Sequence, residues 1–179
     1  VKLDTPANVD RVDVRSAVEM RDAVMESLPG ADVFVGVAAV ADYRPATPAD
    51  QKMKKGPATL GLELVGNPDI IAEVAALDDG PLTVGFAAET ENLETHAREK
   101  LSRKRLDMIA ANRVGQDGSG FESEQNEILL LSAQDERPLG RGSKQHLARL
   151  LICEIAARLN GKEGIETGSD KNSRPPSGE

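Results

Sequence analysis

The sequence predicts one open α/β domain, with a mostly parallel, Rossmann-like sheet and helices on both faces. Two continuous apolar runs, residues 33–40 and 82–88, are typical of strands buried on both faces of a parallel sheet. Segments with helical spacing alternate with such runs, which implies right-handed βαβ units. The 179 residues, 39% of them hydrophobic, are enough for one domain with a core.

The expected strands are recognised by alternation or by apolar runs. Residues 9–14 alternate apolar and charged side chains, which is the pattern of a half-buried strand. The other five segments are apolar along most of their length, and their ranges are 33–40, 59–65, 82–88, 107–111 and 127–132.

Polar caps mark the starts of the expected helices. Ser16 and Glu19 have the spacing of a capping box. Asn67 precedes a proline at a first helical position, and Asn92 and Ser143 are the caps of the last two helices. The expected helices cover residues 17–27, 68–77, 93–105 and 144–159.

Two segments lack a regular pattern. Residues 41–58 form a long loop with several basic side chains, and long loops in compact domains are usually functional. From Gly161 the sequence is polar and rich in Gly, Ser and Pro. We therefore expect a domain over 1–160 and a disordered tail over 161–179. Because the chain opens with Val1, we expect it to be the inside of a longer polypeptide.

Composition excludes several classes of protein. With 22 basic and 30 acidic residues, the net charge is −8, which disfavours binding to nucleic-acid backbones. Only 2% of residues are aromatic, too few for a base-stacking surface. No apolar stretch approaches the roughly 18 residues of a membrane span, and no signal peptide is recognised, so we expect a cytoplasmic protein. The only cysteine, Cys153, is expected to be a buried small side chain.

Polar residues follow three of the expected strands. Each strand ends in small residues and then in Asp42, Glu89 or Asn112. In open α/β sheets, ligands bind beyond the carboxyl ends of the strands, and a carboxylate there can hold Mg²⁺ or a ribose hydroxyl. The alternative is that the three residues cap turns, and both interpretations stay open.

Basic residues gather in two places on this acidic chain. Lys52, Lys54 and Lys55 lie in the long loop. Lys100 and Lys104 are four residues apart and share one helix face, where a bound anion would offset their repulsion. Two lysine clusters and a carboxylate edge suggest a nucleoside triphosphate with its metal, and the alternative is solvated surface charge.

The helix start at 67–70 presents free backbone N–H groups that suit a phosphate or a base edge, although plain capping explains this segment as well.

The sequence has neither G-x-G-x-x-G nor G-x-x-x-x-G-K-[ST], which disfavours a nicotinamide-dependent oxidoreductase and a P-loop enzyme. His96 and His146 are far apart and are expected to be exposed.

Five motifs in a fixed order carry a family resemblance. They are AAVADYR at 38–44, K-x-K-K at 52–55, NPDI at 67–70, GFAAET at 85–90 and A-N-x-V at 111–114. The chain resembles, over about residues 5–160, the phosphopantothenate–cysteine ligase (phosphopantothenoylcysteine synthetase) domain. In bacteria that domain is usually the C-terminal half of a bifunctional coenzyme A biosynthesis flavoprotein, the phosphopantothenoylcysteine decarboxylase/synthetase.

The resemblance implies a CTP-dependent ligation. CTP activates the carboxylate of 4′-phosphopantothenate as an acyl-cytidylate, and L-cysteine then attacks to give 4′-phosphopantothenoylcysteine. The implied partners are these small molecules and Mg²⁺, with no nucleic acid and no membrane, in a homodimer or higher oligomer. The preference for CTP over ATP rests on the resemblance alone.

The resemblance also implies roles for individual residues. Asp42 matches the contact to CTP and its Mg²⁺, and Lys52 matches the loop lysine that supports acyl-cytidylate formation. The remaining residues that match nucleotide contacts are Gly36, Ala39, Pro68, Asp69, Ile70, Ile71, Phe86, Lys100 and Lys104.

One part of the family pattern is absent. The glycine-rich strand–turn–helix that opens the family domain, and its motif for phosphopantothenate, do not precede Val1. The chain therefore resembles a fragment that lacks its first βαβ unit, and we expect it to be inactive alone. FMN would belong only to the missing decarboxylase domain. The alternative function is a non-catalytic nucleotide-binding module.

Overall fold

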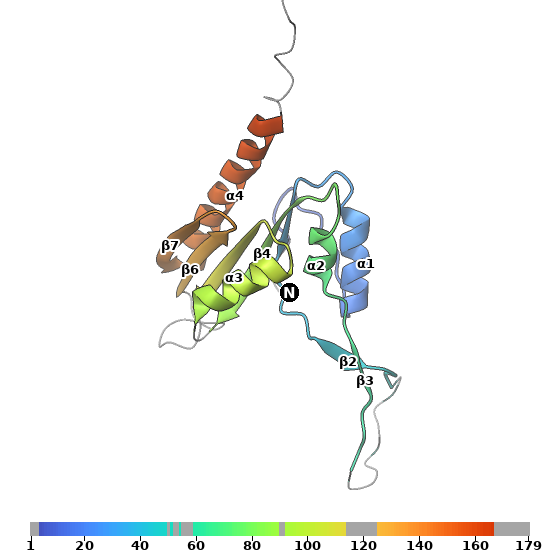
Figure 1. Ribbon diagram of the computed structural model, residues 1–179. Coiled ribbons are helices and arrows are strands. Elements are labelled where there is room, and N and C mark those ends of the chain that lie inside the picture. The colour runs from blue at the N-terminus through green and yellow to red at the C-terminus, as the bar shows by residue number, and fades with distance from the viewer. Residues whose placement is uncertain are drawn as a thin grey trace, which may run out of the picture. The chain divides into compact units, whose positions relative to one another are not determined.

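The computed structural model describes residues 4–49, 51, 54, 59–89, 92–113 and 125–166. The chain divides into two compact units, Val1–Thr83 and Val84–Glu179. Five strands form one sheet in the order β1-β4-β5-β6-β7, and two further strands, β2 and β3, form a separate ribbon. Helices accompany the strands along the chain (Figure 1), so the α/β class predicted from the sequence is confirmed.

The first unit begins with helix α1 (Ala17–Ser27). The predicted capping box is present: Ser16 Oγ accepts a hydrogen bond from the Glu19 N–H at 3.2 Å, and the Glu19 carboxylate accepts one from the Arg15 N–H at 2.8 Å. Gly30, with φ of +80°, lies in the turn after the helix. A salt bridge of 2.8 Å between Arg21 and Glu73 joins α1 to helix α2 (Ile70–Ala75).

Strand β1 (Val33–Gly36) follows α1, and a two-stranded ribbon follows β1. The ribbon consists of β2 (Tyr43–Pro45) and β3 (Leu64–Gly66), which pair antiparallel with Tyr43 opposite Gly66. In Figure 1 the ribbon extends away from α1 and α2. The first ribbon strand lies in the segment predicted to be a long loop, because three residues are too few to show a periodicity.

The second unit is built on the strands β4 (Leu82–Glu89), β5 (Met108–Arg113), β6 (Gln125–Ser132) and β7 (Glu136–Ser143). Strands β4 and β5 are parallel, as the sequence predicts. The other pairs, β5 with β6 and β6 with β7, are antiparallel. The sheet is therefore mixed, with an antiparallel hairpin at its edge, and strand β7 was not predicted.

Helices α3 (Leu93–Arg103) and α4 (Lys144–Glu166) both contact the strands of the second unit. The continuous run of buried residues from Met108 to Ala111 shows that both faces of β5 are covered. On α4 the buried side chains are Leu147, Leu151 and Ile155, which are spaced by four residues and form one stripe. Ser143 Oγ accepts a hydrogen bond from the His146 N–H at 3.3 Å, so the predicted cap of α4 is confirmed.

Three predicted strands are wrong or too long. Residues 9–14 form no strand, and Val12 is 64% exposed. The strand expected over 33–40 ends at Gly36, and the one expected over 59–65 is confined to β3. An alternating or apolar pattern becomes a strand only where a neighbour supplies hydrogen bonds along its whole length, and the sequence does not show where such a neighbour ends.

One predicted helix cap is wrong, and a second lies at its predicted position without the side-chain bond. Helix α2 begins at Ile70 with Asp69 as its cap, and Asn67 bonds elsewhere. Asn92 precedes α3 but makes no side-chain capping bond, since its backbone is left-handed with φ of +50°. Asparagine tolerates that conformation better than most residues. The helix itself ends two residues earlier than expected, at Arg103.

The C-terminal predictions need two corrections. Helix α4 continues beyond Gly161 to Glu166, so the predicted disordered tail does not begin at 161. Residues 167–179 lie outside the described residues. Cys153 is exposed rather than buried, because it lies between Leu151 and Ile155 on a helix and therefore faces away from their stripe. Within the described residues, no helix is both long and apolar enough to cross a membrane.

Candidate functional site

The residues predicted to bind a nucleotide are divided between the two units, and each group is described separately. The first unit contains Gly36, Ala39, Asp42, Pro68, Asp69, Ile70 and Ile71. The second unit contains Phe86, Lys100 and Lys104. Lys52 and Lys55 lie outside the described residues, whereas Lys54 is described and exposed.

In the first unit, the loop after β1 is joined to the start of α2. The backbone N–H of Asn67 donates a hydrogen bond of 2.8 Å to the carbonyl oxygen of Asp42. This bond brings together the motifs AAVADYR and NPDI, which lie on either side of the β2–β3 connection in the sequence. The side chain of Asp42 is exposed, so its carboxylate is accessible to a ligand. Ala39, in the same loop, is exposed as well.

The first turn of α2 carries the remaining residues of this group. Asp69 Oδ1 accepts a hydrogen bond of 3.4 Å from the Ala72 N–H and so caps the helix. Ile70 is buried with 7% exposure, whereas Pro68 and Ile71 are half-buried. The Asp69 carboxylate therefore has a structural role in addition to the predicted ligand contact.

Gly36 and Ile71 lie in contact. A Cβ atom added at Gly36 would lie 2.9 Å from Cδ1 of Ile71, which is closer than real Cβ contacts allow. A side chain at the end of β1 would therefore require the Ile71 side chain on α2 to shift. Both residues belong to the predicted nucleotide-binding set, and their contact is not visible in the sequence.

In the second unit, Phe86 and Lys100 are joined directly. Lys100 Nζ donates a hydrogen bond of 2.8 Å to the carbonyl oxygen of Phe86. Phe86 lies opposite Ala110 in the parallel pair of β4 and β5. Lys104 is the C-terminal cap of α3, and its backbone N–H bonds the carbonyl of Lys100 at 3.0 Å. Both lysine side chains are half-buried.

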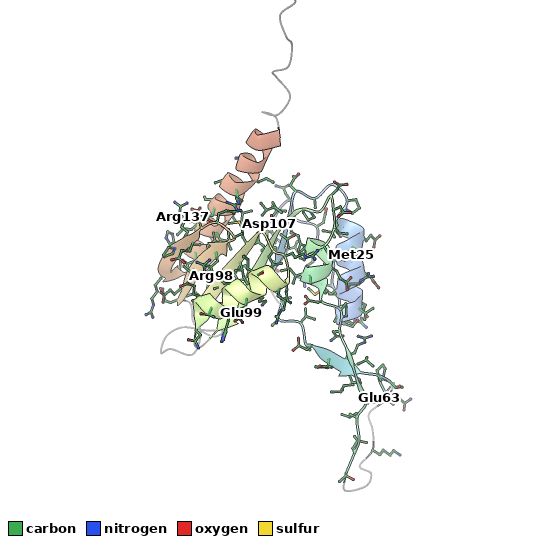
Figure 2. All side chains as sticks on the ribbon, viewed as in Figure 1. Met25, Glu63, Arg98, Glu99, Asp107 and Arg137 are labelled. Carbon is green, nitrogen blue, oxygen red and sulfur yellow. The ribbon has the colours of Figure 1, made fainter. Side chains whose placement is uncertain are left out.

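Two arginines, Arg98 and Arg103, also lie on α3. Arg98 (Figure 2) forms salt bridges with Glu94 at 2.9 Å and Glu136 at 2.5 Å. The hydrogen bond with Glu94 raises the pKa of Arg98, as does the hydrogen bond with Glu136. Arg98 therefore connects α3 to its own first turn and to β7. Arg103 is exposed in the last turn.

The polar strand ends predicted from the sequence meet in part. In the parallel pair, Asn112 lies opposite Ala88, and Glu89 lies opposite Arg113. The carboxyl ends of β4 and β5 therefore lie side by side, as expected for parallel strands.

Metal-ligating side chains are not clustered in the part of the chain that the structure describes. Among the described residues, no group of three or more His, Cys, Asp and Glu side chains is placed to hold a metal ion. His96 and His146 are both exposed, as predicted.

Sequence reasoning missed two residues of the first group. Asn67 was interpreted as a helix cap, but its side-chain Nδ2 donates to the carbonyl of Ala41 at 2.8 Å. Arg44 was placed in a loop and given no role, but its Nη1 donates to the carbonyl of Gly66 at 2.7 Å and to Asn67 Oδ1 at 3.1 Å. Both residues lie inside the recognised motifs, and this was the only feature of the sequence that pointed to a role for them.

The chain is similar to curated bacterial proteins that bear the name coenzyme A biosynthesis bifunctional protein CoaBC. The protein from Vibrio cholerae is 51% identical over 162 residues, which cover 89% of this chain and 41% of the relative. The protein from Escherichia coli K12 is 49% identical over 167 residues, covering 90% and 41%. The chain thus spans about two-fifths of the length of these relatives.

Two solved structures share the fold. The crystal structure of the C-terminal domain of coenzyme A biosynthesis bifunctional protein CoaBC superposes with a TM-score of 0.72 at 30% identity, covering 89% of this chain and 73% of that one. A DNA/pantothenate metabolism flavoprotein from Streptococcus pneumoniae gives a TM-score of 0.70 at 19% identity. The family model described as the DNA/pantothenate metabolism flavoprotein C-terminal domain matches residues 1–159. The chain therefore belongs to this family of C-terminal domains.

Proposed function

We propose that this chain is the CTP-handling part of a phosphopantothenate–cysteine ligase that acts in coenzyme A biosynthesis. The relatives named as coenzyme A biosynthesis proteins support the pathway, and the family match over residues 1–159 supports the domain. The observation that carries the proposal is the contact between two of the recognised motifs. The bond of 2.8 Å from Asn67 N–H to the Asp42 carbonyl joins AAVADYR to NPDI.

The proposed reaction has two steps. In the first, a carboxylate oxygen of 4′-phosphopantothenate attacks the α-phosphorus of CTP, and pyrophosphate leaves with the bonding electrons. In the second, the amine of L-cysteine attacks the acyl carbon, loses a proton and displaces CMP. Both steps develop negative charge on phosphate oxygens, so positioning and charge neutralisation supply most of the catalysis.

The residues of the first unit are assigned to the base and the metal-bound phosphates. Asp42 presents an exposed carboxylate, and Pro68, Asp69, Ile70 and Ile71 form the segment that would contact the cytosine. Gly36 and Ala39 would line the nucleotide. Lys52 is assigned to the triphosphate and to the activation step, on the basis of the family motif alone.

The residues of the second unit are assigned to the phosphates and to packing. Lys100 and Lys104 supply ammonium groups from one end of α3, and Phe86 supplies an apolar surface from β4. The bond between Lys100 and the Phe86 carbonyl restricts the conformations of the lysine side chain before any anion binds. A restricted side chain loses less conformational entropy when it binds a phosphate.

The donor set fits Mg²⁺ in one respect. Mg²⁺ is usually held by one or two carboxylates together with substrate phosphates and water, rather than by a cage of protein ligands. One exposed carboxylate, that of Asp42, meets this requirement. The ion, when bound, supplies charge neutralisation for the triphosphate. FMN is assigned to the decarboxylase part of the longer proteins and has no assigned residue in this chain.

Titration calorimetry tests the binding half of the proposal. CTP, ATP and NADH are each titrated into the chain with Mg²⁺, and selective binding of CTP is expected. Binding of NADH alone would instead favour a nicotinamide-dependent oxidoreductase.

Turnover tests the catalytic half. The longer polypeptide that carries this domain is assayed with phosphopantothenate, CTP and cysteine by following pyrophosphate release. Binding of CTP without turnover in the longer polypeptide would identify a non-catalytic nucleotide-binding module. We also propose a cytoplasmic location. We further propose a homodimer or higher oligomer, and sedimentation would test this oligomeric state.

A further inference from the structure

We propose that Asn67 and Arg44 are positioning residues for the nucleotide site. They hold the Asp42-bearing loop and the start of α2 as one rigid element, so that the metal-binding carboxylate and the base-contacting segment 68–71 keep a fixed separation. The inference rests on the proposed function of Asp42 and of that segment. Neither Asn67 nor Arg44 is assigned a ligand contact.

Asn67 bonds two consecutive residues of the loop. Its backbone N–H donates to the Asp42 carbonyl at 2.8 Å, and its side-chain Nδ2 donates to the Ala41 carbonyl at 2.8 Å. Two bonds to neighbouring carbonyls fix both the position and the direction of the backbone at Asp42. Because Pro68 follows Asn67 directly, the same residue also fixes the start of the base-contacting segment.

Arg44 determines how the Asn67 amide is oriented. Its Nη1 donates to Asn67 Oδ1 at 3.1 Å and to the Gly66 carbonyl at 2.7 Å. With the oxygen of the amide facing Arg44, the nitrogen must face Ala41, so the two bonds of the side chain support one another. The guanidinium is charged, and charge-assisted hydrogen bonds are the stronger kind.

The β2–β3 ribbon begins at this network. The Asp42–Asn67 bond is followed by the pairs Tyr43 with Gly66 and Arg44 with Val65. Lys52 lies in the connection between β2 and β3. The network therefore fixes the base of the ribbon whose connection carries the lysine assigned to activation.

The location of these bonds distinguishes positioning from simple stabilisation. Ala41, Asp42 and Gly66 are exposed, so water can solvate their carbonyls when the network is removed. Exchanging such bonds for bonds to water costs much less folding free energy than leaving buried polar groups without partners. Loss of the network should therefore release the loop without unfolding the unit.

Substitution of Asn67 by aspartate gives the sharpest test. Asn67→Asp keeps the shape and the acceptor for Arg44, but it places a carboxylate oxygen against the Ala41 carbonyl. Asn126→Asp is the matched control, because Asn126 is half-buried on β6 and uses Oδ1, which aspartate retains, to accept from the Glu127 N–H. Arg44→Met and Arg44→Lys form a second pair, in which lysine keeps the charge.

The readouts are Mg²⁺-dependent CTP affinity by calorimetry, the melting temperature, and hydrogen exchange of the Asn67 amide, all on the full chain. For Asn67→Asp and Arg44→Met, we expect CTP affinity to fall about ten-fold, the change that corresponds to one or two lost hydrogen bonds. Arg44→Lys should recover part of the affinity, and Asn126→Asp should leave it unchanged. Exchange of the Asn67 amide should accelerate in the affected variants, while the melting temperature stays close to that of the wild type.

A double-mutant cycle separates positioning from a general structural effect. If Asn67 acts through Asp42, then adding Asn67→Asp to Asp42→Asn should cause a smaller further loss of affinity than it causes alone. Fully additive losses would overturn the inference. So would faster exchange of the Asn67 amide with unchanged CTP affinity. Failure of the wild-type chain to bind CTP would overturn the proposed function, and this inference with it.

Discussion

The ammonium group of Lys100 on α3 donates a hydrogen bond of 2.8 Å to the backbone carbonyl of Phe86 on β4. The two residues are fourteen positions apart, and both belong to the predicted nucleotide-binding set. Their bond ties the last turns of the helix to the strand that precedes it. On the same helix, Arg98 forms salt bridges with Glu94 and Glu136.

Lys100→Met should weaken CTP binding. Methionine keeps most of the aliphatic stem but removes the charge, and a hydrogen bond to a charged group contributes about 1.5–3 kcal/mol. Calorimetric titration with CTP measures the loss. Arg103→Met is the control, because Arg103 is an exposed cation in the last turn of the same helix. Equal losses in the two variants would mean that only the overall charge of α3 matters.

Asp42→Asn should weaken Mg²⁺-dependent CTP binding and leave the fold intact. The backbone of Asp42 accepts the bond from Asn67, and asparagine preserves that bond. Removing one charge-assisted contact should cost about 1.5–3 kcal/mol. The measurement is CTP affinity at saturating Mg²⁺. Asp78→Asn removes the same charge from another exposed position of the first unit and should have no effect. Unchanged affinity in Asp42→Asn would refute its assignment.

Gly36→Val should destabilise the first unit. A Cβ atom at this position would lie 2.9 Å from Cδ1 of Ile71, and overpacking of this kind typically costs about 1–3 kcal/mol. Urea unfolding followed by circular dichroism measures the cost. Gly61→Ala is the control, because a Cβ at Gly61 would meet no atom within 4 Å. If Gly36→Val is as stable as the wild type, the Ile71 side chain moves aside without a cost in stability.

Ser16→Ala should lower stability through the loss of a helix cap. Ser16 Oγ accepts the Glu19 N–H at 3.2 Å, and replacing such a cap by alanine costs about 0.5–2 kcal/mol. The shift of the urea midpoint measures it. In Ser27→Ala the lost hydroxyl bonds the Ala23 carbonyl within the helix, so a smaller change is expected. A larger loss of stability in Ser27→Ala than in Ser16→Ala would argue against the capping box.

Lys52→Gln should slow formation of the acyl-cytidylate more than it weakens CTP binding. A loop lysine that closes on the phosphates as charge develops contributes mainly to the transition state. Pre-steady-state measurement of CMP-adduct formation in the longer polypeptide tests this expectation. Lys54→Gln, a neighbouring exposed lysine, serves as the control. If both variants form the adduct at the wild-type rate, Lys52 is only a solvated charge.

Much of the fold could be predicted because its signals are local. The capping box at Ser16 and the cap at Ser143 depend on residues three positions away, and both are confirmed. The strands near 82–88, 107–111 and 127–132 are found within a few residues of their expected ranges. The ribbon strand β2 and the edge strand β7 were missed, because their exposed and short or glycine-containing segments carry no apolar pattern.

The sequence by itself determined the α/β class, the starts of α1 and α4, and the motifs that identify the family. Tertiary structure alone decided which of two available roles a polar residue takes. Asn67 is a good helix cap by its type, yet it bonds Ala41, twenty-six positions away, while Asp69 caps the helix. It likewise decided that Cys153 is exposed on α4. The physical reason is that capping and periodicity depend on near neighbours in the chain, whereas burial and hydrogen-bond partners depend on which distant segments the fold brings into contact.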